Sequence, residues 1–168
     1  MAKFQEMIGF DLDTENVGLD GTCVRTRNTY MLSSSTQSYI LPKTRRRFTY
    51  GRHLFEAKVT ALSGDWFFVG VCAPNEDPVC CISPGSWCIA SDGLIYGEGK
   101  VSKVRKSKFS CGDIFGVALN YDEKYISFYK NGALVGTARL PKTVGALVGF
   151  VEVLGPATIK FGRATSFT

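Results

Sequence analysis

Histidine is almost absent from this sequence: His53 is the only one among 168 residues. The usual catalytic triads use a histidine as the general base that activates a nucleophile, so any such triad would depend on this one side chain. His53 stands at the start of a strand-like segment, where a structural hydrogen bond is the usual role. Gly97-Glu98-Gly99 lacks the third glycine of a dinucleotide-binding loop. Carboxylates that meet only in space are invisible in a sequence, but no nucleophile–base set is present, and the sequence predicts no enzymatic activity.

Long hydrophobic runs are missing as well. No apolar stretch approaches the ~18 residues that cross a bilayer as a helix. The longest, Trp66–Ala73, has the length of a strand and is interrupted by Gly70. The first residues soon turn acidic and contain no apolar segment of the kind found in secretory signals. We therefore expect a chain that does not enter the membrane and works in the cytoplasm or the nucleus.

Cysteines occur without the spacing of a metal site. Six are present, at positions 23, 72, 80, 81, 88 and 111, and no two of them form a C-x-x-C pair. Because zinc sites need four ligands in paired spacing, we predict no metal and no other cofactor. The even count allows disulfides, but without an export signal reduced thiols are the better interpretation.

Acidic residues are scarce in two stretches. The net charge is +5, and Lys43–Arg47 and Lys100–Lys108 are basic runs without an acid. Such runs can contact phosphates, which makes nucleic-acid binding the alternative function. The other interpretation is that they are solvated charges that discourage pairing at sheet edges. We favour the second, because single-strand recognition also needs exposed stacking aromatics, and few adjoin these runs.

Alternation with a period of two runs through most of the chain. In Arg52–Ala61, apolar and more polar residues alternate, as in a strand with one face in a core. Trp66–Cys72 is continuously apolar, which is typical of a central strand covered on both faces. Ile114–Asn120 has a similar character. No window shows a helical stripe, and glycines and prolines divide the sequence into short strands.

A hairpin is the clearest local signal. Asn131-Gly132 lies between the strand-like runs Tyr125–Lys130 and Ala133–Ala138, and this pair favours a type I′ turn because both positions need positive φ. With the preceding strand, the hairpin makes an antiparallel meander. The closing strands are predicted at Ala146–Val151 and Thr158–Phe161. Together these patterns predict an all-β, antiparallel β-sandwich.

Five segments, in order, resemble motifs of the SPRY (B30.2) domain family. They are Phe48–Val59, Gly64–Val71, Ser86–Tyr96, Gly112–Asp122 and Ile126–Gly132. The resemblance implies a bent antiparallel sandwich of two sheets, a concanavalin-like jelly roll, formed by residues 1–168 as a single domain. Residues 1–47 would form N-terminal strands and an arm, and residues 48–161 the SPRY core. The motif residues expected to pack inside are Phe55, Trp66, Val69, Val71, Trp87, Tyr96, Val117, Leu119 and Phe128.

The resemblance also implies a function. SPRY domains act as protein-interaction modules that present substrates to ubiquitin ligases or serve as scaffolds, and they bind partners through loops at one edge. We accordingly expect a monomeric, non-catalytic adaptor that binds a protein or a short peptide. A carbohydrate-binding sandwich is a weaker alternative, with Asn75-Glu76-Asp77 as its only candidate site.

The closing segment is similar to SOCS-box and F-box-associated members of the family. In these, the residues matching Val153, Leu154 and Gly155 line a peptide pocket, with a large aromatic at the position of Leu154. The pocket threonine falls at Asp65, and the pocket tyrosine falls near Val79–Cys81, where this chain has no aromatic. The three departures predict a retained surface with changed specificity.

Loops on a rigid sandwich vary without disturbing the core, so binding is often found there. We expect five loops to gather at one edge: Thr26–Thr29, Leu62–Asp65, Pro74–Pro84, Gly97–Ser110 and Glu152–Pro156. The apolar loop Pro74–Pro84 is either an exposed contact or tucked onto the sheet. The predicted partner-binding residues are Arg27, Asn28, Asp65, Asn75, Val79, Val153, Leu154 and Gly155.

Overall fold

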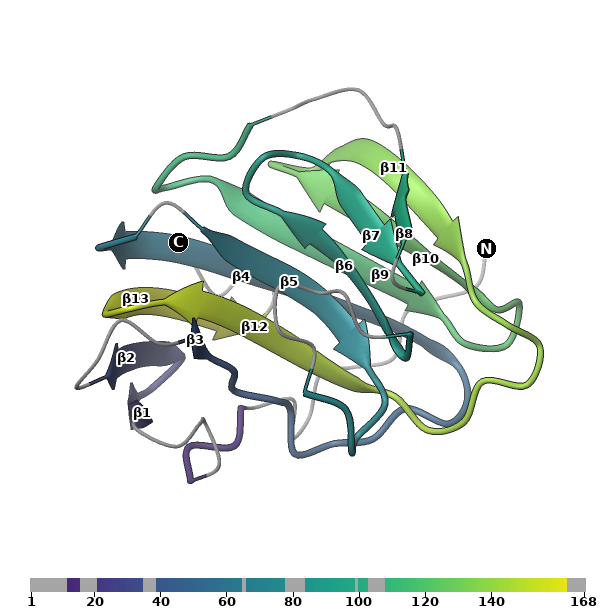
Figure 1. The fold of residues 1–168 in the computed structure, drawn as a ribbon, viewed down its shortest axis with the longest axis horizontal. Coiled ribbons are helices and arrows are strands. Elements are labelled where there is room, and N and C mark those ends of the chain that lie inside the picture. Colours follow the sequence, from purple (N-terminus) through teal and green to yellow (C-terminus); the bar gives the residue numbers. More distant parts are fainter. Residues whose placement is uncertain are drawn as a thin grey trace.

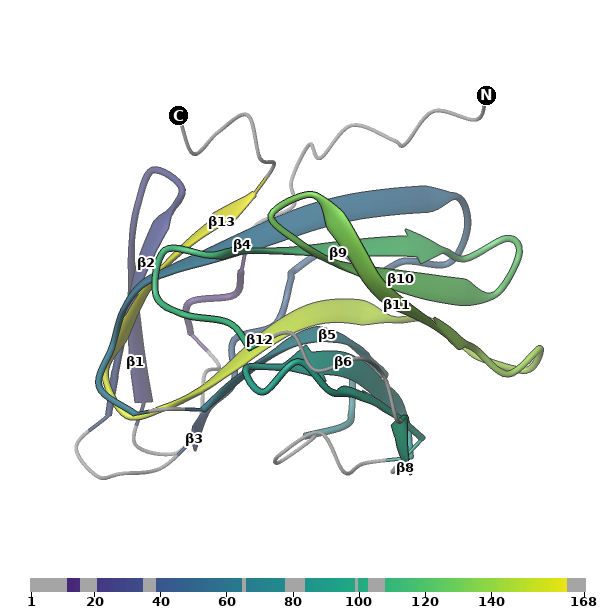
Figure 2. The same cartoon turned by 90° about the horizontal axis from the view of Figure 1, so that it is seen from above.

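The computed structural model of the chain describes residues 12–15, 21–34, 39–64, 66–77, 84–98, 100–102 and 108–162. These residues form thirteen strands and no helix, arranged in two antiparallel sheets (Figure 1). Among them, no helix exists that could cross a membrane. Figure 2 shows the sheets as two layers, with β4, β9 and β10 in one and β5, β6 and β12 in the other. The all-β sandwich predicted from the alternation is confirmed.

The first sheet has seven strands and contains the predicted meander. In spatial order its strands are β1 (Gly21–Thr26), β2 (Thr29–Ser34), β13 (Ala157–Gly162), β4 (Arg52–Leu62), β9 (Ile114–Asn120), β10 (Tyr125–Lys130) and β11 (Ala133–Arg139). The turn between β10 and β11 has φ angles of 50° at Asn131 and 84° at Gly132, as a type I′ turn requires.

The second sheet has six strands, and most of them are shorter. Its order is β3 (Tyr39–Ile40), β12 (Val148–Leu154), β5 (Phe67–Cys72), β6 (Ser86–Ala90), β7 (Ile95–Gly97) and β8 (Lys100–Ser102). Consecutive strands β12 and β13 lie in different sheets, so the loop between them crosses from one layer to the other. β12 begins and ends later than the predicted strand Ala146–Val151, whereas β13 extends one residue beyond each end of the predicted Thr158–Phe161, because pairing with β5 and β4 sets their limits.

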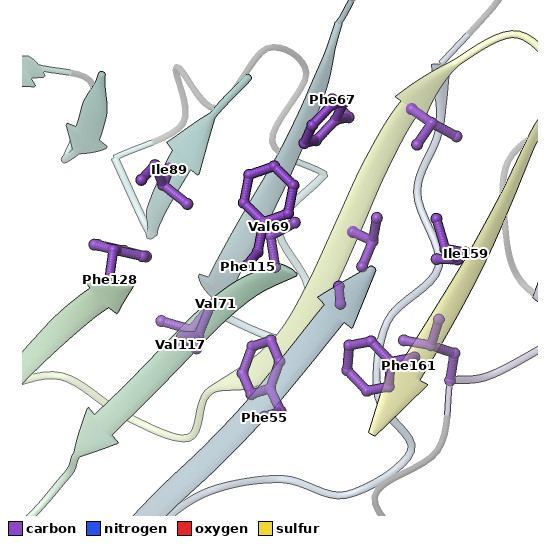
Figure 3. Packing of buried hydrophobic residues seen from close by; sticks show 14 of the residues in the cluster. Phe55, Phe67, Val69, Val71, Ile89, Phe115, Val117, Phe128, Ile159 and Phe161 are labelled. Atoms are coloured by element: carbon purple, nitrogen blue, oxygen red, sulfur yellow. The ribbon is translucent and has the colours of Figure 1, made fainter. Parts of the chain in front are cut away.

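The core lies between the sheets and follows the period-two pattern. Phe55, Ala57 and Val59 on β4 are each 0% exposed, whereas the residues between them are only partly covered. Across the layers, the rings of Phe67 and Phe115 meet edge to face at 4.5 Å. Figure 3 shows such side chains from both sheets pointing toward one another.

A second apolar cluster covers the outer face of the second sheet. It consists of Phe68, Cys72, Cys88, Ala90, Val148 and Phe150, with Tyr39, Leu41 and Tyr96 packed against it. This explains why β5 is buried on both faces, as its continuous apolar run predicted.

Two sequence-based expectations are wrong here. Trp66 precedes β5 and is 42% exposed, because the buried part of the run begins only at Phe67. Cys88 is disulfide-bonded, with its partner outside the described residues, so reduced thiols do not account for all six cysteines. Cys23, Cys72 and Cys111 are free.

Candidate functional site

The loops that follow β4 and β12 lie side by side at one end of the sandwich. The backbone N–H of Ser63 donates to the carbonyl of Pro156 at 3.0 Å, and the N–H of Leu154 donates toward the carbonyl of Trp66 at 3.4 Å. We call the surface made by residues 62–64, Trp66 and residues 154–156 the loop edge. Its backbone contacts hold two segments far apart in sequence in a fixed relation.

Two glycines make this contact possible. A Cβ atom on Gly64 would lie 2.8 Å from the carbonyl oxygen of Leu154, closer than real Cβ atoms approach backbone. Gly155 has a φ of 75°, a left-handed conformation that side chains disfavour, and its added Cβ would lie 2.9 Å from the Ser63 hydroxyl. The conformation of the loop edge is therefore fixed by its own backbone contacts, without a bound partner.

An aromatic row extends from the loop edge across the outer face of the second sheet. The rings of Trp66 and Phe68 stack at 6.3 Å with 17° between their planes, and Phe68 meets Tyr96 edge to face at 5.8 Å. Phe68 is buried, whereas Trp66 exposes 42% of its surface. Trp66 thus presents a large ring to solvent on a rigid base, which is the usual character of an interface anchor.

The opposite flank of the loop edge is apolar too. Val24 and Met31, paired across β1 and β2, are 61% and 60% exposed. They line a hollow of about 560 Å³ on the outer face of the first sheet, together with Leu32, Ser33, Ala61, Leu62, Ser63, Pro156, Ala157 and Thr158. Leu62, Ser63 and Pro156 also belong to the loop edge, so the hollow adjoins it.

Leu154 and Gly155 are the predicted site residues that the structure brings together at the loop edge. Leu154 is partly exposed and opposite Tyr39 on β3. Val153, by contrast, is 0% exposed and lies in the core between Ile40 and Phe67. Its side chain has no surface to offer to a partner, because strand alternation turns it inward. Asp65 and Val79 lie outside the described residues.

The other predicted residues lie elsewhere. Asn28 lies with Arg27 in the turn after β1, and its backbone carbonyl accepts a hydrogen bond from the N–H of Phe161 at the far end of β13. Five residue steps along the chain, about 17 Å, separate Phe161 from Pro156 at the loop edge. Asn75 follows the opposite end of β5. The prediction that the loops containing Asn28 and Asn75 gather with Leu154 at one edge is wrong, because each of them adjoins the strand end that is farther from the loop edge.

Charged side chains surround the end of β5 near Asn75, and they form hydrogen bonds and ion pairs within the domain. The Lys43 ammonium donates to the carbonyl of Pro74 at 3.2 Å, to the carbonyl of Glu76, and to the Asp77 carboxylate at 3.1 Å. Arg45 lies 3.7 Å from the Asp13 carboxylate. The first basic run is thus partly structural. Of the second, residues 103–107 lie outside the described part of the chain.

His53 has the structural role that the sequence suggested. Its Nε2 atom lies 2.6 Å from the carbonyl oxygen of Tyr50, and its ring packs on Phe48 at 4.4 Å. Burial lowers the pKa of the imidazole below its ordinary value of 6.5. Within the described ranges, no group of three or more metal-ligating side chains occurs.

Sequence reasoning missed Trp66 as a surface residue and Met31 altogether. The prediction that Glu152 begins a loop at the edge is wrong: it lies within β12, opposite Phe68, and is 0% exposed, because the pairing of β12 with β5 continues past it. A carboxylate so buried is unusual. Trp66 is the first residue of an apolar run, and the alternation of the sequence does not show that its ring is exposed. Met31 becomes part of the apolar hollow only because β13 pairs with β2, which the sequence does not show.

Comparison with known proteins agrees with this architecture. The SPRY domain family model matches residues 52–161. Among curated proteins, no sequence matches the chain significantly. The SPRY domain of human HERC1 superposes with a TM-score of 0.74 at 19% identity, covering 92% of this chain and 98% of that one.

Two further solved structures are similar at the level of the fold. A human SPRY domain has a TM-score of 0.69 at 19% identity, with 83% of this chain and 94% of that chain covered. The TRIM65 PSpry domain has a TM-score of 0.69 at 14% identity, with coverages of 92% and 90%. The family match extends over more than half of the chain, from β4 to β13. The chain therefore belongs to the SPRY domain family, whose members are in general protein–protein interaction modules.

Proposed function

We propose that this chain is a non-catalytic adaptor or scaffold subunit that binds a short segment of a partner protein at the loop edge. The observation that carries the proposal is Trp66, which is stacked on Phe68 and 42% exposed. Large aromatic side chains on a rigid base contribute most of the binding energy in many interfaces. Leu154 and Pro156 would provide the apolar surroundings that exclude water from it.

The energetics favour a peptide or a loop as the bound element. Gly64 and Gly155 fix the backbone of the loop edge, so little conformational entropy is lost there on binding. Both flanks are apolar, and the partner segment would place apolar side chains against Trp66 and Met31. Truncating Trp66 should cost about 2 kcal/mol or more of binding free energy, as at other interface hot spots.

Selection from a random peptide library displayed on phage tests this proposal directly. Peptides selected on the wild-type domain should bind the Trp66→Ser and Leu154→Asp variants at least tenfold more weakly. The matched control is Tyr50→Ser, because Tyr50 is also an exposed aromatic, 62% exposed, but precedes the opposite end of β4. This variant should bind the peptides as the wild type does.

The control also defines the result that would overturn the proposal. If the selected peptides bind the Trp66 and Tyr50 variants with equal affinity, the loop edge is not the binding surface. Thermal unfolding of each variant must first show a folded domain, so that a loss of affinity reports the surface and not the fold.

A further inference from the structure

Among the described residues, one edge of the first sheet has no neighbouring strand. There β11 is the last strand in the sheet order, and its one partner is β10 (Figure 1). Within the described part of the chain, the backbone hydrogen bonds of β11 go to this neighbour alone. The hydrogen bond between the hydroxyls of Thr137 and Ser127, at 3.0 Å, also stays within the pair. An unpaired strand edge is a template for another strand.

The register shows which backbone groups face outward. The N–H of Leu140 donates to the carbonyl of Lys124, one pair beyond Tyr125 and Arg139. In an antiparallel ladder, hydrogen-bonded and non-hydrogen-bonded pairs alternate. Ala138 therefore bonds to β10, whereas the N–H and C=O groups of Thr137 and Arg139 point away from it. These two residues present donors and acceptors in the pattern that an added strand needs.

The usual protection of edge strands covers only half of β11. A bulge interrupts the register between Phe128 and Tyr129 and affects the first part of the strand. From Gly136 to Arg139 the pairing is regular, and this stretch contains no proline and no acid. The only charge is Arg139, at the end. Natural sheets usually block such a stretch with proline, inward charges or a covering segment.

The chemistry beside the open stretch points to an acidic strand. Arg139 is exposed and makes no ion pair with a described residue, and the same holds for Lys142, just beyond the strand. On the other face, Val135 and Ala138 are partly buried and pack on the core. A segment lying alongside would therefore meet positive charge on its outer face and apolar surface on its inner face.

We propose that β11 accepts an extended segment of a partner protein as an eighth strand, with a carboxylate opposite Arg139 and small apolar residues on the inward face. This surface is separate from the loop edge: four strand spacings, about 19 Å, lie between β11 and β13. A second copy of the chain is a poorer occupant, because antiparallel pairing of β11 with itself would leave Arg139 of each copy without a carboxylate.

The probe is a capped synthetic peptide in which valine and glutamate alternate, compared with one in which valine and lysine alternate. Amide hydrogen exchange, followed by NMR, is the measurement. In the free protein, the amides of Thr137 and Arg139 should exchange faster than that of Ala138. Excess glutamate peptide should slow both at least tenfold, and the lysine peptide should not.

Variants separate the backbone from the side chains. Thr137→Pro removes an outward N–H that the fold does not use, and it should abolish the protection by the glutamate peptide. Thr137→Val keeps this N–H and loses only the hydroxyl, so it should behave as the wild type does. Arg139→Glu leaves the ladder intact and should reverse the preference toward the lysine peptide.

Three results would overturn this inference: no slowing by the glutamate peptide, equal slowing by both peptides, or a concentration-dependent dimer of the free domain that protects the same amides. Trp66→Ser should leave the peptide effect unchanged. The test is thereby independent of the function proposed for the loop edge, and either proposal can fail without the other.

Discussion

Replacing Gly155 by alanine should destabilise the fold through the loop edge. Its φ of 75° disfavours any residue with a Cβ atom, which costs about 1–2 kcal/mol. The new Cβ would also lie 2.9 Å from the Ser63 hydroxyl. Overpacking generally costs about 1–3 kcal/mol, and the lower end applies because a serine hydroxyl can rotate away. Gly155→Ala should therefore lower the free energy of unfolding by roughly 2–3 kcal/mol.

Urea denaturation, with thermal unfolding beside it, measures this loss, and two other glycines calibrate it. For a chain of this size, each kcal/mol lowers Tm by about 2–4 °C. Gly132→Ala has a φ of 84° but nothing within 4 Å of its Cβ, so it should show only the conformational cost. Gly145→Ala has neither problem and should change stability by less than about 0.5 kcal/mol.

A second substitution separates the two costs at Gly155. Ser63→Ala, introduced into the Gly155→Ala variant, should recover the steric part and leave the conformational part. If Gly155→Ala is no more destabilising than Gly145→Ala, the left-handed geometry does not constrain this loop, and the preorganised loop edge is refuted. If Ser63→Ala recovers nothing, the contact between the two loops is not the source of the additional loss.

Three further predictions concern His53, Cys72 and Lys43, side chains that are buried or partly buried. Because burial lowers the pKa of His53, the imidazole takes up a proton more readily in the unfolded chain than in the folded one. The free energy of unfolding should therefore fall as the pH drops below about 6.5. Urea denaturation at several pH values should show this fall, and a smaller one in His53→Gln. Burial raises the pKa of the Cys72 thiol to about 12, so this thiol should not react in the native domain at pH 8. A maleimide should label exposed Cys111 in the native domain and Cys72 only after unfolding, which mass spectrometry would show. Lys43→Met removes the donor to three oxygens of the loop after β5 and should cost about 1–3 kcal/mol in urea denaturation, whereas Arg47→Met, at an exposed position, should change stability by less than about 0.5 kcal/mol.

Much of the fold could be predicted because its signals are local. Alternation along β4 follows from side chains pointing to opposite faces, whatever the strand pairs with. Asn131-Gly132 predicts its own turn because two successive positive φ angles exclude most residues. The start of β5 could not be placed this way. An apolar run does not reveal which of its residues the other sheet covers, and Trp66 falls just outside.

The candidate site was predictable only in part. Leu154 and Gly155 were identified from a resemblance, and the structure places them against Ser63 and Trp66. Asn75 and the predicted turn residues Arg27 and Asn28 were assigned to the same edge, and they lie at other ends of their strands. The order of the loops along the chain does not show at which end of the sandwich each loop lies, because that depends on which strands pair and in which direction.

The sequence by itself determined the strands, the meander, the inward side chains and the shortage of catalytic groups, because these depend on residue chemistry and on a period of two. Only the tertiary structure decided which loops meet, that Val153 is inside while Trp66 is outside, and that no described strand pairs with the outer edge of β11. These features depend on pairing between strands that are far apart in sequence. Such pairing is made by backbone hydrogen bonds, which almost any residue can form, so the residue types do not reveal it.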